Sequence, residues 1–346
     1  LGIEHKRVGE TGVYAEIKGN LAGDKTIVLR ADIDALDVEE AHECPYKSTI
    51  PGKMHACGHD FHAAMLLTAA KMLKENEAEL KGTVKFMFQP AEETFEGSKN
   101  MIEHGILENP KVDAALAYHV SPGQMPVGIY MYNSTGTMMY SVDGFHIEIK
   151  GKGSHGAYPQ NSIDPINIAA HVYLALQSII AREVDPSKAC LMTVGKFQAG
   201  TAANIIPDTA VLEGTIRTND KASRELLVRR MKETAIRTAK TFGGTAKITM
   251  ISEVPPLICN PEFTEQIVGF MKELDIPKLT PYPGISASAS EKSYNDSRLI
   301  LSMMYKSSSC LAKALRMALP FSLFSCCSPF ATSAYCLKKY PLLLIQ

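Results

Sequence analysis

The sequence has 346 residues, and a single hydrophobic core rarely grows beyond about 250–300 residues, so we expect two domains. Hydrophobic residues make up 45% of the chain and charged residues 21%, as in an ordinary soluble globular protein. The formal net charge of −1 argues against a nucleic-acid binder, which would carry a basic surplus.

Neither end of the chain predicts export or a membrane span. Leu1–Lys6 contains no apolar signal-peptide core, and because the chain starts with Leu rather than Met we expect a fragment. Eight cysteines do not form a disulfide framework in a chain of this size, so a reducing, cytoplasmic compartment is expected. Met317–Leu337 is uncharged and long enough to cross a bilayer, but Pro320, Pro329 and its serines argue against a transmembrane helix.

The first 120 residues alternate strands with a helix. Apolar runs predict buried strands at Thr26–Arg30, Thr83–Phe88 and Ala114–Val120. A helical pattern covers Phe61–Glu75. Its predicted core contacts are Phe61, Met65, Met72 and Leu73. This alternation indicates an α/β layer with a mostly parallel sheet, in which functional sites gather where strands end.

A second unit is predicted from Gly144 onward. The expected strands are Phe145–Lys150, Ala189–Phe197, Thr209–Thr218 and Thr245–Ile251, and the expected helices are Pro165–Ala181 and Lys221–Thr241. The order β-α-β-β-α-β is that of a ferredoxin-like unit. We therefore expect a smaller domain at residues 142–253, inserted between two parts of an α/β domain at residues 1–141 and 254–291. Val254–Pro261 would be the returning linker.

Cys57 and His59 lie in the densest group of metal-binding side chains, His55–His62. A tight turn at Gly58 can direct both at one ion, and cysteine and histidine are ligands of zinc and its neighbours. A Cys-x-His pair alone is a weak signal. The alternative is a buried cysteine beside a helix N-terminus, with His59 as the cap.

Two adjacent carboxylates, Glu92 and Glu93, come just after the second predicted strand, which Pro90 ends by removing a donor. Adjacent residues in an extended chain point to opposite sides. One carboxylate can therefore ligate a metal while the other handles a proton. The alternative is a solvated acidic loop.

The other two strands also end in polar side chains. Asp32 and Asp34 share one face by the period of two, and His119 ends the third strand. A lone histidine on an apolar strand is more often a satisfied core residue. Four strand-end clusters on one sheet nevertheless favour a metal site.

These motifs together resemble one family. Met54–Asp60, Gln89–Glu93 and Arg30–Leu36 resemble the amidohydrolase branch of the metallopeptidases that includes hippurate hydrolase and indole-acetyl-amino-acid hydrolase. The segments that look like that family's lid and dimerisation domain are Gly151–Ala157, Ala203–Asp208 and Gly214–Thr218. The resemblance covers residues 1–291 and implies metal-dependent hydrolysis of N-acyl amino acids by a homodimer, with the lid domain between subunits.

The resemblance also implies residue roles. The ligands of a two-metal site, holding Zn, Mn, Co or Ni, would be Cys57, His59, Glu93 and His119. Glu92 would be the general base and then the general acid, and Asp34 would orient the site. His155, Asn204 and, more weakly, Arg217 would contact the substrate. Such a site activates water and polarises an amide carbonyl, while a glutamate transfers the proton to the leaving amine.

The resemblance stops after Glu291. Family members carry one more histidine ligand near the C-terminus, whereas no histidine follows His171 here, so the second metal should bind weakly. From Ser297 onward there is no acidic residue, and four cysteines crowd into residues 310–336. We interpret residues 292–346 as out-of-frame or foreign sequence that packs poorly, the alternative being a genuine cysteine-rich tail. The family's opening segment also has no counterpart before Leu1.

Three functions stay open at this point. The first is an N-acyl-amino-acid amidohydrolase impaired by truncation. The second is a catalytically dead relic that only dimerises. The third is a related metallo-aminopeptidase or carboxypeptidase, which the Cys-x-His motif disfavours because the peptidase branches resemble an Asp at that ligand step.

Overall fold

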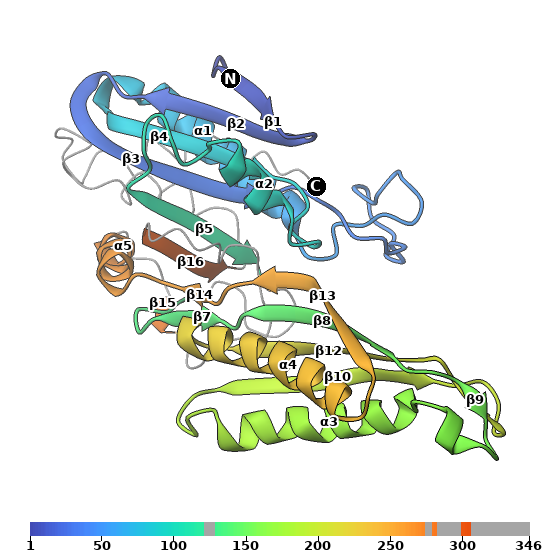
Figure 1. Ribbon diagram of the computed structural model, residues 1–346. Coiled ribbons are helices and arrows are strands. Elements are labelled where there is room, and N and C mark those ends of the chain that lie inside the picture. Colours follow the sequence, from blue (N-terminus) through green and yellow to red (C-terminus); the bar gives the residue numbers. More distant parts are fainter. Residues whose placement is uncertain (121–128, 274–278, 282–298, 306–346) are drawn as a thin grey trace. The chain divides into compact units, whose positions relative to one another are not determined.

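The computed structural model describes residues 1–120, 129–273, 279–281 and 299–305, and the chain divides into two compact units (Figure 1). The first unit holds the described parts of Leu1–Gly136, Ile258–Pro283 and Asp296–Gln346. The second contains Thr137–Leu257. Both combine helices with a sheet, so the α/β class expected from the strand–helix alternation is confirmed.

The first unit is built on an eight-stranded mixed sheet with the order β1-β2-β4-β3-β5-β16-β6-β15. Its strands are β1 (His5–Val8), β2 (Gly12–Lys18), β3 (Leu21–Asp32), β4 (Lys81–Gln89), β5 (Ala114–Val120), β6 (Tyr130–Tyr132), β15 (Leu279–Pro281) and β16 (Leu299–Tyr305). The central strands β4, β3, β5 and β16 are parallel. β2 and β6 run antiparallel to their neighbours β4 and β16.

Helices cover both faces of this sheet. Side chains of α1 (His59–Glu75) and α5 (Pro261–Glu273) pack with those of β3, β4 and β5 in one core cluster. On β4, Phe86 belongs to that cluster, while the next residue, Met87, packs with Met101 of α2 (Gly97–Glu103). Since successive strand residues face opposite ways, α2 covers the other face. A short 3-10 helix, Glu77–Glu79, leads from α1 toward β4.

The buried side of α1 is centred on His62, Leu66, Ala69 and Leu73. Phe61, predicted as a core contact, is 54% exposed, and that prediction is wrong. Phe61 precedes His62 by one residue and is therefore rotated about 100° away from the centre of the buried face. Met65 and Leu73 are buried, as predicted, whereas Met72, also predicted as a core contact, is only partly buried.

The second unit has a four-stranded antiparallel sheet with the order β10-β12-β8-β13. Its elements in chain order are β7 (Thr137–Met139), β8 (Val142–Lys150), β9 (Ser154–His155), the 3-10 helix Pro159–Asn161, α3 (Pro165–Arg182), β10 (Cys190–Ala199), β11 (Ile205–Ile206), β12 (Thr209–Thr218), α4 (Lys221–Thr241) and β13 (Thr245–Val254). The two-residue strand β14 (Leu257–Ile258) falls at the boundary of the two units. Both helices pack on one face of the sheet, in a core that includes Phe145, Leu176 and Met231.

Both long helices of this unit begin at an aspartate. The side chain of Asp164 accepts hydrogen bonds from the backbone N–H groups of Ile166 and Asn167, and that of Asp220 from Ser223. These carboxylates satisfy N–H groups that have no partner within the helix. The same local signal explains why the sequence predicts both helix starts at the correct residue.

Leu299–Tyr305 forms β16, whose backbone pairs with β5 and β6. This pairing concerns the backbone of seven residues, and the expectation that residues 292–346 pack poorly stays a prediction. An apolar β-forming run can join a sheet through its backbone hydrogen bonds, whatever the composition of the sequence around it. The other residues of that segment, including Met317–Leu337, lie outside the described residues. No helix in the described ranges is long and apolar enough to cross a membrane.

Candidate metal centre

The candidate site lies where three parallel strands of the first unit end. β3 ends at Asp32, β4 at Gln89 and β5 at Val120. Parallel strands bring their carboxyl ends to one edge of the sheet, and the loops that follow supply the polar side chains. The N-terminus of α1 reaches the same edge, because Gly58 turns the chain with a φ of +84° immediately before His59.

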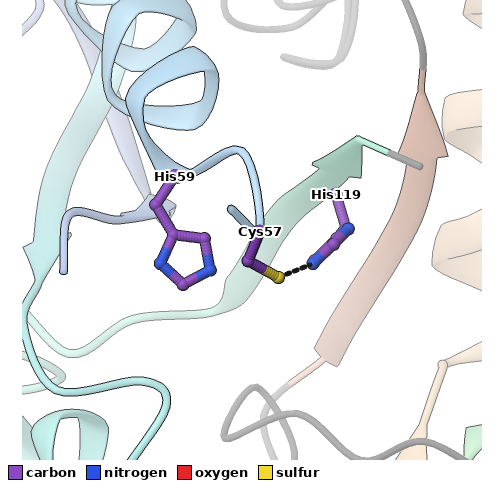
Figure 2. Close-up of side chains that lie close together, drawn as sticks. All are labelled: Cys57, His59 and His119. Atoms are coloured by element: carbon purple, nitrogen blue, oxygen red, sulfur yellow. Dashed lines mark hydrogen bonds between the residues drawn. The ribbon is translucent and has the colours of Figure 1, made fainter. Parts of the chain in front are cut away.

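Cys57, His59 and His119 form the first of three groups of metal-binding atoms among the described residues (Figure 2). Their ligand atoms lie within 4.8 Å of one another, and the Cys57 sulfur is 3.4 Å from Nε2 of His119. The second group, with the same limit of 4.8 Å, contains His59, Glu92 and Glu93. The third group contains Asp32, His59 and His62. His59 belongs to all three, so the structure brings all four sequence-predicted ligands together around one imidazole ring.

The two nitrogens of the His59 ring face different partners. Nδ1 lies 3.1 Å from both the carboxylate and the carbonyl oxygen of Asp34. Nε2 lies 3.7 Å from Oε1 of Glu93. Within the described part of the chain, that nitrogen and that oxygen are buried without a hydrogen-bond partner. Buried polar atoms are nearly always paired, so two such atoms facing each other among a thiol, an imidazole and a carboxylate fit a bound divalent metal.

Asp34 anchors this arrangement. It accepts hydrogen bonds from His59 and, at 3.0 Å, from the backbone N–H of Glu93. Burial raises the pKa of Asp34, but these hydrogen bonds outweigh it and hold the pKa below its usual value. Asp34 thus links the β3 and β4 ends and orients His59.

The charges at the site perturb two candidate ligands in the same direction. Burial lowers the pKa of His59, but the hydrogen bond to Asp34 and the nearby Cys57 and Asp32 raise it to about 10. Burial and then the negative charge of Glu92 raise the pKa of Glu93. A metal requires the deprotonated ligands, so metal ions and protons compete for these two groups.

The sequence motifs assign no role to Asp32 and His62, yet both are buried at the site. Asp32 accepts a hydrogen bond from Nδ1 of His62 and one of 2.6 Å from Arg30. The spacing places His62 on the helix face of His59, three residues before it, and Asp32 on the strand face of Asp34, but it does not indicate that His62 and Asp32 contact each other.

The predicted substrate-binding residues all lie in the second unit. His155 and Asn204 are exposed neighbours: β9 pairs with β11, and the Asn204 carbonyl accepts the N–H of Gly156 at 2.8 Å. Arg217 lies near the end of the ten-residue strand β12, whose first residue, Thr209, follows soon after β11. At about 3.3 Å per residue, most of that strand separates Arg217 from the other two.

Thiol, imidazole and carboxylate groups at the ends of the parallel strands of an α/β sheet are typical of a metal-dependent hydrolase. Residues 28–298 match the peptidase family M20/M25/M40, and the chain belongs to this family. The resemblance to its amidohydrolase branch, expected from the motifs, is confirmed.

The relatives include named enzymes. N-acetyl-L-cysteine deacetylase of Bacillus subtilis (strain 168) is 45% identical over 264 residues, covering 76% of this chain and 61% of the relative. IAA-amino acid hydrolase ILR1-like 4 of Arabidopsis thaliana is 42% identical over 257 residues, covering 74% of this chain and 57% of the relative. This chain therefore spans less than two thirds of the length of either enzyme.

A solved structure supports the fold. The YXEP protein of Bacillus subtilis, described as a dinuclear metal binding peptidase from the M20 family, superimposes with a TM-score of 0.75 at 32% identity. The match covers 92% of this chain and 87% of that protein.

Proposed function

We propose that this chain is a metal-dependent amidohydrolase that cleaves the amide bond of N-acyl amino acids. The proposal is supported by membership in the M20/M25/M40 family and by relatives named as a deacetylase of N-acetylcysteine and a hydrolase of amino-acid conjugates. The observation that carries it is the pair of buried, facing atoms, Nε2 of His59 and Oε1 of Glu93, within a cluster of Cys, His and Glu side chains.

Cys57, His59, Glu93 and His119 would hold the metal, of which Zn, Mn, Co and Ni are candidates. When bound, a divalent metal lowers the pKa of a water molecule and polarises the amide carbonyl. Since these four residues would have to serve two ions, we propose that one metal binds tightly and a second weakly.

Glu92 is our candidate for proton transfer. It is buried beside His59 and Glu93 and lies within reach of the same metal-binding atoms. Its carboxylate would take a proton from the attacking water and return it to the leaving amine, so that one water adds across the C–N bond. Asp34 would keep His59 in orientation without touching the reacting atoms.

For the second unit we propose the ferredoxin-like lid and dimerisation domain of residues 142–253. Its support is the chain order β8-α3-β10-β12-α4-β13 and the antiparallel sheet with both helices on one face. In this proposal His155, Asn204 and Arg217 contact the substrate, the protein is a homodimer, and it works in the cytoplasm.

The test measures metal content and turnover on the same samples. The metal-loaded chain should hydrolyse N-acetyl or N-benzoyl amino acids, and Glu92→Gln should lower kcat by about 10²–10⁴-fold while metal content stays the same. Glu96→Gln, an exposed glutamate four residues further on, is the matched control and should have no effect.

A carboxypeptidase is the second candidate, because thermostable carboxypeptidase 2 of Saccharolobus solfataricus is 38% identical over 279 residues, covering 79% of this chain and 70% of the relative. Faster cleavage of dipeptides than of N-acyl amino acids would favour it. No turnover of either substrate by a metal-loaded chain would favour a relic that only dimerises.

A further inference from the structure

His62 lies on α1 at the site but is 2% exposed, and both of its ring nitrogens are engaged. Nε2 lies 2.9 Å from the backbone nitrogen of Val120, and Nδ1 contacts Oδ1 of Asp32. A backbone N–H can only donate, so Nε2 must be the acceptor and the proton must be on Nδ1, donated to Asp32. With both nitrogens used in this way, His62 is not a metal ligand, although it lies beside two of them.

The other backbone group of Val120 holds His119. Nδ1 of His119 lies 2.5 Å from the Val120 carbonyl oxygen, which can only accept, so the proton of that ring is on Nδ1. Its Nε2 therefore carries a lone pair, and this nitrogen lies 3.4 Å from the Cys57 sulfur. A ligand histidine needs this tautomer, and its other nitrogen usually depends on an outer partner of this kind.

The hydrogen bonds continue from Asp32 across the sheet. Oδ2 of Asp32 accepts from Nη1 of Arg30 at 2.6 Å, and Nε of Arg30 donates to Oε1 of Gln89 at 2.7 Å. Asp32, Arg30 and Gln89 are all buried. One run of hydrogen bonds thus joins the ends of β5, β3 and β4, with His62 as the only member contributed by α1. The charge-assisted contact between Arg30 and Asp32 is the strong member of this run, while Nη2 of Arg30 is buried without a hydrogen-bond partner among the described residues.

We propose that His62 is a positioning residue that holds His119 in its metal-binding tautomer and orientation, by fixing the backbone of Val120 against the buried carboxylate of Asp32. The inference rests on the proposed role of His119 as a ligand. It assigns to His62 no contact with substrate or metal.

Two substitutions separate the contact of His62 with Asp32 from its contact with the backbone of Val120. The amide of His62→Asn reaches the place of Nδ1 and can still donate to Asp32, but it is too short to contact Val120. The longer His62→Gln places an acceptor near the position of Nε2 and can keep the Val120 contact. If His62 acted only through packing, both substitutions would perturb the His119 tautomer and the Zn²⁺ affinity, each in proportion to its loss of stability. His5→Asn, at an exposed histidine on β1, is the matched control.

The first measurement uses the full, metal-free chain with ¹⁵N-labelled histidine and long-range ¹H–¹⁵N correlation spectra. We expect His119 in a single Nδ1–H form in the unsubstituted chain, in His62→Gln and in the control. In His62→Asn we expect a mixture of tautomers. A single Nδ1–H form of His119 in His62→Asn would overturn the inference, as would a mixture in His62→Gln. If His62→Asn does not fold, the His62→Gln spectrum still decides.

The second measurement is Zn²⁺ affinity by competition with a chromophoric chelator. His62→Asn should weaken binding by about 10–100-fold, the range found when outer partners of ligands are removed, and His62→Gln by clearly less. Equal weakening in both would overturn the inference. If the unsubstituted chain binds no Zn²⁺, the proposed function fails, whereas the tautomer spectra still test His62 by themselves.

Discussion

Gly58→Ala tests whether the N-terminus of α1 needs a glycine between the candidate ligands Cys57 and His59. Gly58 has a φ of +84°, where an L-residue costs about 1–2 kcal/mol. An added Cβ would also lie 2.4 Å from Cγ2 of Val120, well inside the normal carbon–carbon contact of about 3.5–4.0 Å. Overpacking of this kind costs about 1–3 kcal/mol. We therefore expect Gly58→Ala to lower the free energy of unfolding of the first unit by about 2–5 kcal/mol.

The control for backbone strain alone is Gly52→Ala. Gly52 has a φ of +70°, but an added Cβ there would meet nothing within 4 Å, so only about 1–2 kcal/mol should be lost. The clash itself is tested by Gly58→Ala combined with Val120→Ala, which removes Cγ2 and leaves Cβ of Val120 3.9 Å away. The double variant should be more stable than the sum of the single effects predicts.

The assay is urea unfolding of the full chain, with hydrogen exchange of the β3, β4 and β5 amides identifying the transition of the first unit. A Gly58→Ala variant that loses no more stability than Gly52→Ala would contradict the predicted clash, as would a double variant that Val120→Ala does not rescue. Zn²⁺ affinity should fall with Gly58→Ala, because Gly58 separates Cys57 from His59 and Val120 follows His119.

Three further predictions concern charges. The pKa of His59 is raised from 6.5 to about 10, so its contribution to the stability of the metal-free chain is complete below about pH 6.5 and is lost as the pH rises through about 10. Urea unfolding measured across this pH range should show that loss of stability, and Asp34→Asn should make the stability depend less on pH. Arg224→Met should lower the free energy of unfolding by about 3–5 kcal/mol, because it leaves the fully buried carboxylate of Asp143 without the guanidinium 2.7 Å away. Arg229 is exposed, so Arg229→Met should change the urea unfolding curve little, and equal effects of the two substitutions would contradict the prediction. Lys85→Met should lower the free energy of unfolding by about 2–6 kcal/mol in thermal or urea unfolding, because each carbonyl deprived of its donor costs about 1–3 kcal/mol. Nζ of this fully buried lysine donates to two carbonyls, those of Ile106 and Glu108. A loss below about 1 kcal/mol would show that water replaces the ammonium group.

Local sequence patterns were enough to predict most helices and strands. The strands Ala114–Val120 and Thr209–Thr218 and the helix Lys221–Thr241 are observed with the predicted bounds. These segments have signals within a few residues: an unbroken apolar run, an alternating strand, and a capping aspartate before an amphipathic helix. The predicted start of β3 was too late, at Thr26 rather than Leu21, because the polar, glycine-containing stretch before Thr26 has no apolar run to signal a strand. Leu21 pairs with Lys81 of β4, and the register then shifts before Thr26.

The residue types of the candidate site were also predictable, since each lies at a strand end or beside a turn that the sequence signals: Cys57, His59, Glu92, Glu93 and His119. Their convergence depended on the parallel arrangement of β3, β4 and β5, for which the alternation of strands and helix was sufficient evidence. The positions of His155, Asn204 and Arg217 relative to a substrate stay predictions.

The sequence by itself therefore determined the fold class, the family and the chemical groups of the candidate metal centre, because these depend on local periodicity and short motifs. Only the tertiary structure decided how those groups are held. His62 finds its partners 30 and 58 residues away, in Asp32 and Val120. Phe61, its neighbour in the chain, faces outward. Such assignments follow from the packing of α1 on the sheet, and residues that meet only in space leave no periodic signal along the chain.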